Sequence, residues 1–219
     1  MAFSAAQLRA LIARGESEEL EFKTRTTHPT RISRTLASLA NTRGGWVLVG
    51  VDDAGRIVGV RDAEEERYQL AEAAAHYVQP PLSPTISEVE TEEGRVVLMV
   101  LVAESPRKPH QALVGPDDWR GYIRTGAASV QTSRLTDKVL SQEPPTSAFE
   151  PLPLNRHELA ALAYVQEHPR LTLPQFQRLI NVSQRRAHRL LIKLVLHGYL
   201  RFHDKEKEPY YTRGPRRLA

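Results

Sequence analysis

The chain has 219 residues, 41 % of them hydrophobic, and a formal net charge of +4 at pH 7. The length favours two domains, and the apolar content suffices for a buried core. The sequence contains no cysteine, which excludes disulfides, thiolate metal sites and cysteine nucleophiles and is typical of a reducing compartment. Since no apolar run reaches membrane-spanning length, we expect a cytoplasmic protein without membrane contact.

Helix-like and strand-like patterns alternate along the first 140 residues. Apolar spacing predicts a helix over 4–14 and a second helix that Thr30 caps and that ends near Gly44. The other predicted elements are strands over 19–23, 46–51, 56–60, 84–91, 95–103 and 121–125 and helices over 62–78 and 133–140. This mixture predicts an α/β or α+β domain.

Two of these strands contain or adjoin the acidic residues that are candidates for a functional site. Along 19–23, Leu20 and Phe22 alternate with charged residues, so Glu21 is expected on the outward face of the strand. The strand over 46–51 is apolar on both faces, which predicts a central position in a covered sheet. Asp52-Asp53-Ala54-Gly55 then predicts a hairpin turn into the strand over 56–60.

A proline-rich stretch separates two parts of different charge. Four prolines fall within 141–155 without a periodic pattern, which indicates a semi-rigid linker. We therefore predict a first domain over 1–141, a linker over 142–154 and a second domain over 155–219. Residues 152–219 hold 13 Lys and Arg against 5 Asp and Glu, a net charge of +8, whereas the remainder has 17 basic and 21 acidic residues, a net charge of −4. A polyanion is the expected partner of the basic part.

The second domain reads as three helices followed by two short strands. The helices are predicted over 156–167 with Asn155 as cap, from Thr172 to Leu179, and from Ser183 to Gly198, and the strands over 199–203 and 210–213. This order is typical of a winged helix-turn-helix domain.

The third helix carries the candidate nucleic-acid contacts. Its side away from the core presents donors for guanine edges and phosphates, and the turn between the two strands adds two lysines. The predicted contacts are Ser183, Gln184, Arg185, Arg186, Arg189, Lys193, Lys205 and Lys207. The same pattern also fits a solvated basic face on a winged helix that binds protein.

Four separated blocks resemble a known family. They are GESEELEFK at 15–23, ANTRGG at 40–45, VGVDDAGRIVG at 49–59 and GYIRTGAA at 121–128. In this order they resemble the Schlafen-type AlbA-like nucleic-acid-binding domain over about residues 5–140. Bacterial members often carry a C-terminal winged helix and are described as DNA-binding or transcriptional regulators, so the resemblance implies such a role here.

The resemblance to Schlafen ribonucleases further implies an acidic, metal-dependent nuclease site. Glu16, Glu21 and Asp53, or Asp52 in place of Asp53, match its carboxylates, which hold Mg²⁺ or Mn²⁺ at a phosphodiester. Each residue also has a structural interpretation. Glu21 suits an ion pair with Lys23, Glu16 a solvated position after a helix, and both aspartates a tight turn.

The favoured interpretation is a homodimeric transcriptional regulator that binds DNA, in preference to RNA, through the winged helix and needs no cofactor. The alternative is an endoribonuclease that requires Mg²⁺ or Mn²⁺ and acts on structured RNA such as tRNA. A P-loop requires a Gly-Lys pair, which this sequence lacks, so ATP hydrolysis is not expected.

Overall fold

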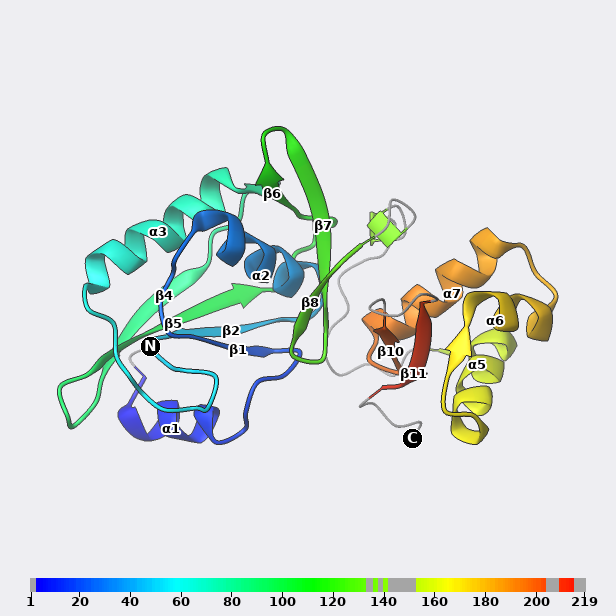
Figure 1. Ribbon diagram of the computed structural model, residues 1–219, viewed down its shortest axis with the longest axis horizontal. Coiled ribbons are helices and arrows are strands. Elements are labelled where there is room, and N and C mark those ends of the chain that lie inside the picture. Colours follow the sequence, from blue (N-terminus) through cyan, green and yellow to red (C-terminus); the bar gives the residue numbers. More distant parts are fainter. Residues whose placement is uncertain (1–2, 133–135, 138–139, 142–152, 204–208, 215–219) are drawn as a thin grey trace. The chain divides into compact units, whose positions relative to one another are not determined.

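The computed structural model describes residues 3–132, 136–137, 140–141, 153–203 and 209–214. The chain forms two compact units, residues 1–132 and 133–219, each treated separately below (Figure 1). Most of the predicted linker over 142–154 and of the predicted helix over 133–140 lies outside the described residues. Within the described ranges, no helix is both long and apolar enough to cross a membrane.

The N-terminal unit combines three helices with two sheets. Its helices are α1 (Ala5–Ile12), α2 (Pro29–Asn41) and α3 (Ala63–His76), and its strands are β1 (Leu20–Lys23), β2 (Gly44–Val49), β3 (Val78–Gln79), β4 (Thr85–Glu90), β5 (Val96–Ala103), β6 (Gln111–Gly115), β7 (Asp118–Thr125) and β8 (Ala128–Gln131). The first sheet has the order β1-β2-β5-β4 and the second β3-β6-β7-β8. Only β1 and β2 pair in parallel among these strands. The mixed content confirms the predicted α+β class for this unit.

Apolar clusters cover both faces of the first sheet, with α1 on one side and α2 and α3 on the other (Figure 1). Val47 and Val49 of β2 pack towards α2 and α3, whereas Leu48 packs towards α1. All three side chains are fully buried. The prediction that this strand is central and covered is therefore confirmed, because alternate residues of one strand enter two different cores.

The predicted strand over 56–60 is wrong. Only an isolated bridge joins Val51 to Ile57, although Gly55 supplies the expected positive φ of 76°. The carbonyl of Gly50 accepts hydrogen bonds from the backbone nitrogens of Val58 and Gly59, each at 2.9 Å. These contacts turn the segment back on itself, so that it does not extend the sheet as a strand.

The start of α2 also differs from its prediction. The helix begins at Pro29 with His28 at the cap position, and no side chain caps it, so Thr30 is not the cap. Proline is favoured at the first helical position because its missing N–H has no intrahelical partner there. The helix ends at Asn41, close to the predicted end near Gly44, and β2 begins at Gly44.

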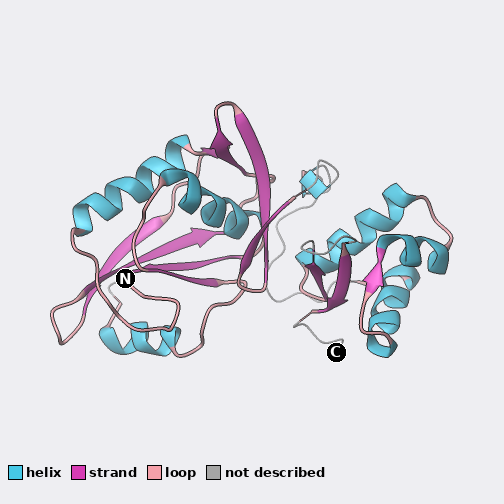
Figure 2. Ribbon diagram, viewed as in Figure 1, coloured by secondary structure: helices cyan, strands magenta, loops and turns pink. Residues whose placement is uncertain are grey.

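From residue 153 onward, the described part of the C-terminal unit combines helices with short strands (Figure 2). They are α5 (Arg156–Glu167), α6 (Leu173–Ile180), α7 (Gln184–Leu196), β9 (Leu171–Thr172), β10 (Leu200–His203) and β11 (Tyr210–Arg213). The strands form an antiparallel sheet in the order β10-β11-β9. The predicted caps Asn155, Thr172 and Ser183 are confirmed, since each side chain accepts a backbone N–H of its helix.

Candidate functional site

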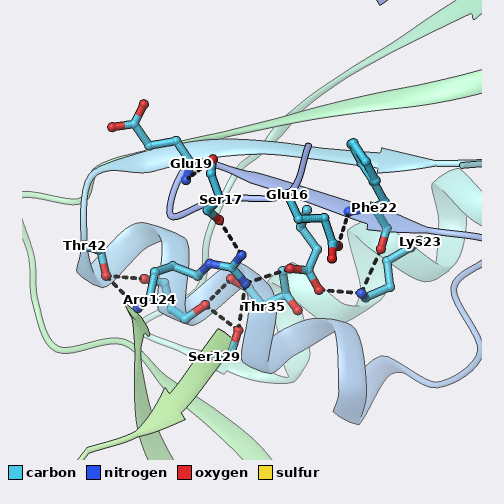
Figure 3. A network of polar contacts seen from close by, with 11 residues as sticks. Glu16, Ser17, Glu19, Phe22, Lys23, Thr35, Thr42, Arg124 and Ser129 are labelled. Atoms are coloured by element: carbon cyan, nitrogen blue, oxygen red, sulfur yellow. Dashed lines mark hydrogen bonds and ion pairs between the residues drawn. The ribbon is translucent and has the colours of Figure 1, made fainter. Parts of the chain in front are cut away.

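A buried arginine links the two sheets of the N-terminal unit. Arg124 lies on β7 with its side chain 0 % exposed. Its Nη1 donates to Glu21 Oε2 at 2.8 Å and to Ser129 Oγ at 3.3 Å, and its Nη2 donates to the carbonyl of Ser17 at 2.7 Å (Figure 3). Because a buried charge is stable only when it is paired and hydrogen-bonded, these contacts bind β7 and β8 to the start of the first sheet.

Helix α2 completes this polar layer. Thr42, just beyond its end, accepts a hydrogen bond from the backbone nitrogen of Arg124 at 2.9 Å and donates to the carbonyl of Ser38 at 2.8 Å. Ser38 Oγ lies 2.9 Å from Ser129 Oγ and donates to the carbonyl of Thr35 at 2.8 Å. The guanidinium thus belongs to a network that spans the three strands β1, β7 and β8 and the helix α2, and sequence reasoning did not single it out.

The two glutamates of the predicted metal site have separate tasks. Glu21 is 7 % exposed and forms ion pairs with Arg124 and Lys23, so the outward position expected for it is wrong. It is buried because the contacts of Arg124 close the second face of β1. Glu16 Oε1 accepts a hydrogen bond from the backbone nitrogen of Phe22 at 2.8 Å, which fixes the entry into β1.

The two aspartates differ as well. Asp52 accepts hydrogen bonds from the backbone nitrogens of Ala54 at 3.0 Å and Arg56 at 2.8 Å, and its other oxygen accepts from Arg56 Nε at 2.7 Å. The hydrogen bond from the Arg56 backbone, above all, lowers the pKa of Asp52. Asp53 is exposed and forms neither a hydrogen bond nor an ion pair with any residue that the structure describes. Asp52 therefore holds the turn, and Asp53 faces solvent.

These carboxylates do not fit a divalent cation in the arrangement described. Arg124 and Lys23 already balance the charge of Glu21, and one oxygen of Glu16 is committed to the backbone. Across the described ranges, no three Asp, Glu or His side chains are grouped as metal ligands. A metal site built from Glu16, Glu21 and Asp53 stays a prediction.

Helix α7 presents the second candidate site. Its exposed side chains, in order, are Gln184, Arg185, Arg186 and Arg189, and Ser183 at the cap is exposed too. On the opposite side Ala187 and Leu191 are fully buried. None of the three arginines forms an ion pair with a described residue. An acceptor from outside the chain can therefore reach three guanidinium groups on slightly more than one helical turn.

Lys193 of α7 is placed differently from these arginines. Its Nζ lies 3.0 Å from Glu158 Oε1, and the Glu158 side chain is 0 % exposed. The other Glu158 oxygen accepts the backbone N–H of Asn155 at 2.8 Å, as part of the capping box of α5. Lys193 therefore joins α7 to α5. The predicted contacts Lys205 and Lys207 lie outside the described residues.

A second basic region lies around the start of α2 and is not visible in the net charge of the whole domain. Residues 22–51 contain five Lys and Arg and no Asp or Glu. Arg25 and Arg31 are exposed, and Arg34 is partly exposed with its guanidinium 5.8 Å from the centroid of the Tyr122 ring. None of these three arginines is ion-paired within the described part of the chain. An acidic domain thus carries a locally basic surface around the start of α2.

Comparison with known protein families identifies the family of the N-terminal unit. A family model described as Schlafen, AlbA_2 matches residues 16–133. No curated protein matches the chain. The N-terminal domain of a Nitrosomonas europaea protein, described as related to the ATP-dependent DNA helicase RecG, is 25 % identical, with a TM-score of 0.38 and coverage of 47 % of this chain and 74 % of that one. The DIP2311 protein of Corynebacterium diphtheriae is 18 % identical, with a TM-score of 0.44 and coverage of 84 % of this chain and 36 % of that one.

Proposed function

The chain belongs to the Schlafen AlbA_2 family, and from this premise we propose that it binds nucleic acid and acts as a DNA-binding transcriptional regulator. The observation that carries the proposal is the exposure of Arg185, Arg186 and Arg189 on α7, none of which forms an ion pair with a residue that the structure describes. Unpaired guanidinium groups bind phosphates and guanine edges without first breaking a contact within the protein.

The order of elements in the C-terminal unit supports a winged helix-turn-helix assignment. Helices α6 and α7 are joined through Asn181, whose φ of 49° makes the tight turn between them, and β10 and β11 follow as the strands of a wing. In such domains the second helix of the pair enters the major groove with its N-terminal residues at the bases. In this chain that helix is α7, and its N-terminal half carries the arginines.

The dimensions and charge of α7 suit this role. A helix of 13 residues is about 20 Å long, and the major groove of B-DNA, about 12 Å wide, accommodates one helix. Arg185 and Arg189 are four positions apart and therefore lie on the same side of the helix. The partial positive charge of the helix N-terminus adds to their attraction for phosphate.

The N-terminal unit and a second copy of the chain extend the proposed interface. Arg25 and Arg31 supply phosphate contacts from the basic surface at the start of α2, in line with the family of this unit. A homodimer places two copies of α7 on half-sites about 34–36 Å apart, one turn of DNA. The contacts that each copy of α7 makes with its half-site then both contribute to the affinity of the dimer for DNA.

A charge-matched pair of variants tests the proposal. The α7 variant carries Arg185→Ala, Arg186→Ala and Arg189→Ala, and the control variant carries Arg14→Ala, Arg56→Ala and Arg61→Ala at exposed positions of the N-terminal unit. We expect the affinity for a short mixed-sequence duplex, measured by fluorescence anisotropy, to fall about 100-fold in the α7 variant and little in the control. Equal affinity of both variants would overturn the proposed role of α7.

A further inference from the structure

Helix α5 has one buried side and one exposed side. The buried side packs against α6, α7, β9 and β11 and consists of Glu158, Ala161, Leu162 and Val165. The exposed side carries residues at helical spacing, which we call the α5 stripe: Arg156, Leu159, Ala163, Gln166 and Glu167. Leu159 is 44 % exposed. An apolar pair, Leu159 and Ala163, thus lies at the middle of the stripe, with charged residues at both ends.

The charges at the ends of the α5 stripe are placed against the helix macrodipole. Arg156 is the first residue of α5 and Glu167 is the last. A cation near the N-terminus and an anion near the C-terminus are both unfavourable in an isolated helix. Arg156 Nε donates to His157 Nε2 at 3.2 Å, and neither Arg156 nor Glu167 forms an ion pair with a residue that the structure describes. Contacts within the described unit therefore give no reason for this placement.

A second α5 in antiparallel orientation makes the same charges complementary. When a two-fold axis passes between Leu159 and Ala163, Leu159 of each copy packs against Ala163 of the other. Arg156 of each copy then lies within one residue step, about 1.5 Å along the helix axis, of Glu167 of the other copy. A large side chain thus meets a small one at the centre of the pair, and a cation meets an anion at each end.

We propose that the α5 stripe is the surface through which two copies of this chain form a symmetric dimer. This inference rests on the proposed function, because it names the surface that joins the homodimer on DNA. The stripe is turned away from Glu158, which pairs with Lys193 of α7 on the buried side. The interface therefore leaves Arg185 and Arg189 of both copies accessible to DNA.

The length of α5 sets the strength of such a dimer. The helix has 12 residues and is about 18 Å long. One pair of helices of this length buries less than about 1,200 Å², which is the lower limit for interfaces of standard size. We therefore expect a concentration-dependent dimer that becomes tighter on DNA with two half-sites, because the first bound copy raises the effective concentration of the second.

Sedimentation velocity of the full chain without DNA tests the apolar part of the interface. Over about 1–500 µM, we expect the mass of the wild type to rise from 24.7 kDa towards twice this value. Leu159→Arg should dimerise at least about tenfold more weakly, because each copy loses a leucine that the interface removes from water. Leu179→Arg on α6 is the matched control, with a leucine that is 47 % exposed, and should dimerise like the wild type.

A charge exchange tests the orientation of the two helices. Arg156→Glu and Glu167→Arg should each weaken the dimer about threefold to tenfold, because like charges then meet, and the variant with both changes should recover the affinity of the wild type. Each single change agrees with the macrodipole, so α5 is expected to stay folded, which far-ultraviolet circular dichroism verifies. Losses that add up in the double variant would overturn the antiparallel pairing.

Two further results would overturn the proposal. One is a monomer at every concentration, as when the α5 stripe binds another protein or the N-terminal unit of its own chain. The other is equal dimerisation of Leu159→Arg and Leu179→Arg. The variant with Arg185, Arg186 and Arg189 replaced by alanine should dimerise like the wild type, so dimerisation and DNA binding are measured independently and failure of one proposal is distinguishable from failure of the other.

Discussion

Arg124 of the N-terminal unit and the arginines of α7 in the C-terminal unit lie in opposite environments. Arg124 of the N-terminal unit is fully buried and contacts Glu21, Ser17 and Ser129, whereas Arg185 and Arg189 of α7 are exposed and have no ion-pair partner in the described ranges. A buried charge that lost its partners would cost several kcal/mol, so Arg124 serves the fold. An exposed guanidinium contributes little to stability and is available to a ligand. The same residue type thus has a structural task where it is buried, as at Arg124, and a proposed recognition task where it is exposed, as on α7.

Replacing Arg124 is expected to have the largest effect. Arg124→Met leaves Glu21 buried with only Lys23 as partner, and we expect the free energy of unfolding to fall by about 3–5 kcal/mol. Trp46 and Trp119 both lie in the N-terminal unit and are the only tryptophans, so urea unfolding followed by tryptophan fluorescence reports on this unit. The double variant with Glu21→Gln should recover part of the loss. A change below about 1 kcal/mol would place Arg124 with the dispensable surface charges.

Lys193 provides a test within α7 itself. Lys193→Met leaves the buried carboxylate of Glu158 without its cation, and we expect a loss of about 2 kcal/mol in the C-terminal unit. Thermal unfolding followed by far-ultraviolet circular dichroism measures this loss, and Arg189→Met serves as the exposed control on the same helix. If Lys193→Met weakened duplex binding more than Arg189→Met in the folded protein, the distinction between paired and unpaired cations would fail.

The basic surface at the start of α2 should have a smaller effect. Arg25→Ala with Arg31→Ala removes two exposed charges, and we expect stability to change by less than about 0.5 kcal/mol. Duplex affinity should fall about threefold to tenfold, since phosphate contacts at the edge of an interface add modestly. Anisotropy titration beside the control variant measures this fall. An unchanged affinity would confine the interface to the C-terminal unit.

The nuclease alternative predicts RNA cleavage that depends on Glu21, and the ion pairs of Glu21 do not favour such a role. We expect wild type and Glu21→Gln to leave tRNA equally intact when pure protein is incubated with tRNA and Mn²⁺. The reason is that the carboxylate of Glu21 is already paired with Arg124 and Lys23. Gel electrophoresis of the RNA provides the measurement. Cleavage by wild type that Glu21→Gln abolishes, in a folded protein, would restore the metal site as the functional centre.

Local signals in the sequence predicted the helix caps of the C-terminal unit. Asn155, Thr172 and Ser183 cap their helices as expected, because a cap depends on the side chain and on backbone two or three positions away. The strand β9 was missed because it has only two residues and exists through its pairing with β11. A periodic pattern cannot reveal such a strand.

The ion pairs that the sequence did not predict join residues that are far apart in the chain. Glu21 was expected to face outward, but its partner Arg124 lies 103 positions away, and only the packing of β7 and β8 brings the two together. Lys193 and Glu158 likewise meet across two helices. The exposed arginines of α7 were predictable because their direction follows from the helical period and the buried face of the same helix.

The salt dependence of duplex binding distinguishes most directly between arginines that contact DNA and arginines that are merely exposed. Duplex affinity is measured over a series of salt concentrations for wild type, the α7 variant and the control variant. If Arg185, Arg186 and Arg189 each neutralise a phosphate, the slope of log K against log salt becomes shallower by about 2.7 in the α7 variant and stays unchanged in the control. The same slope in both variants would contradict the account, because the three exposed arginines of α7 would then contribute no more than any other three surface charges.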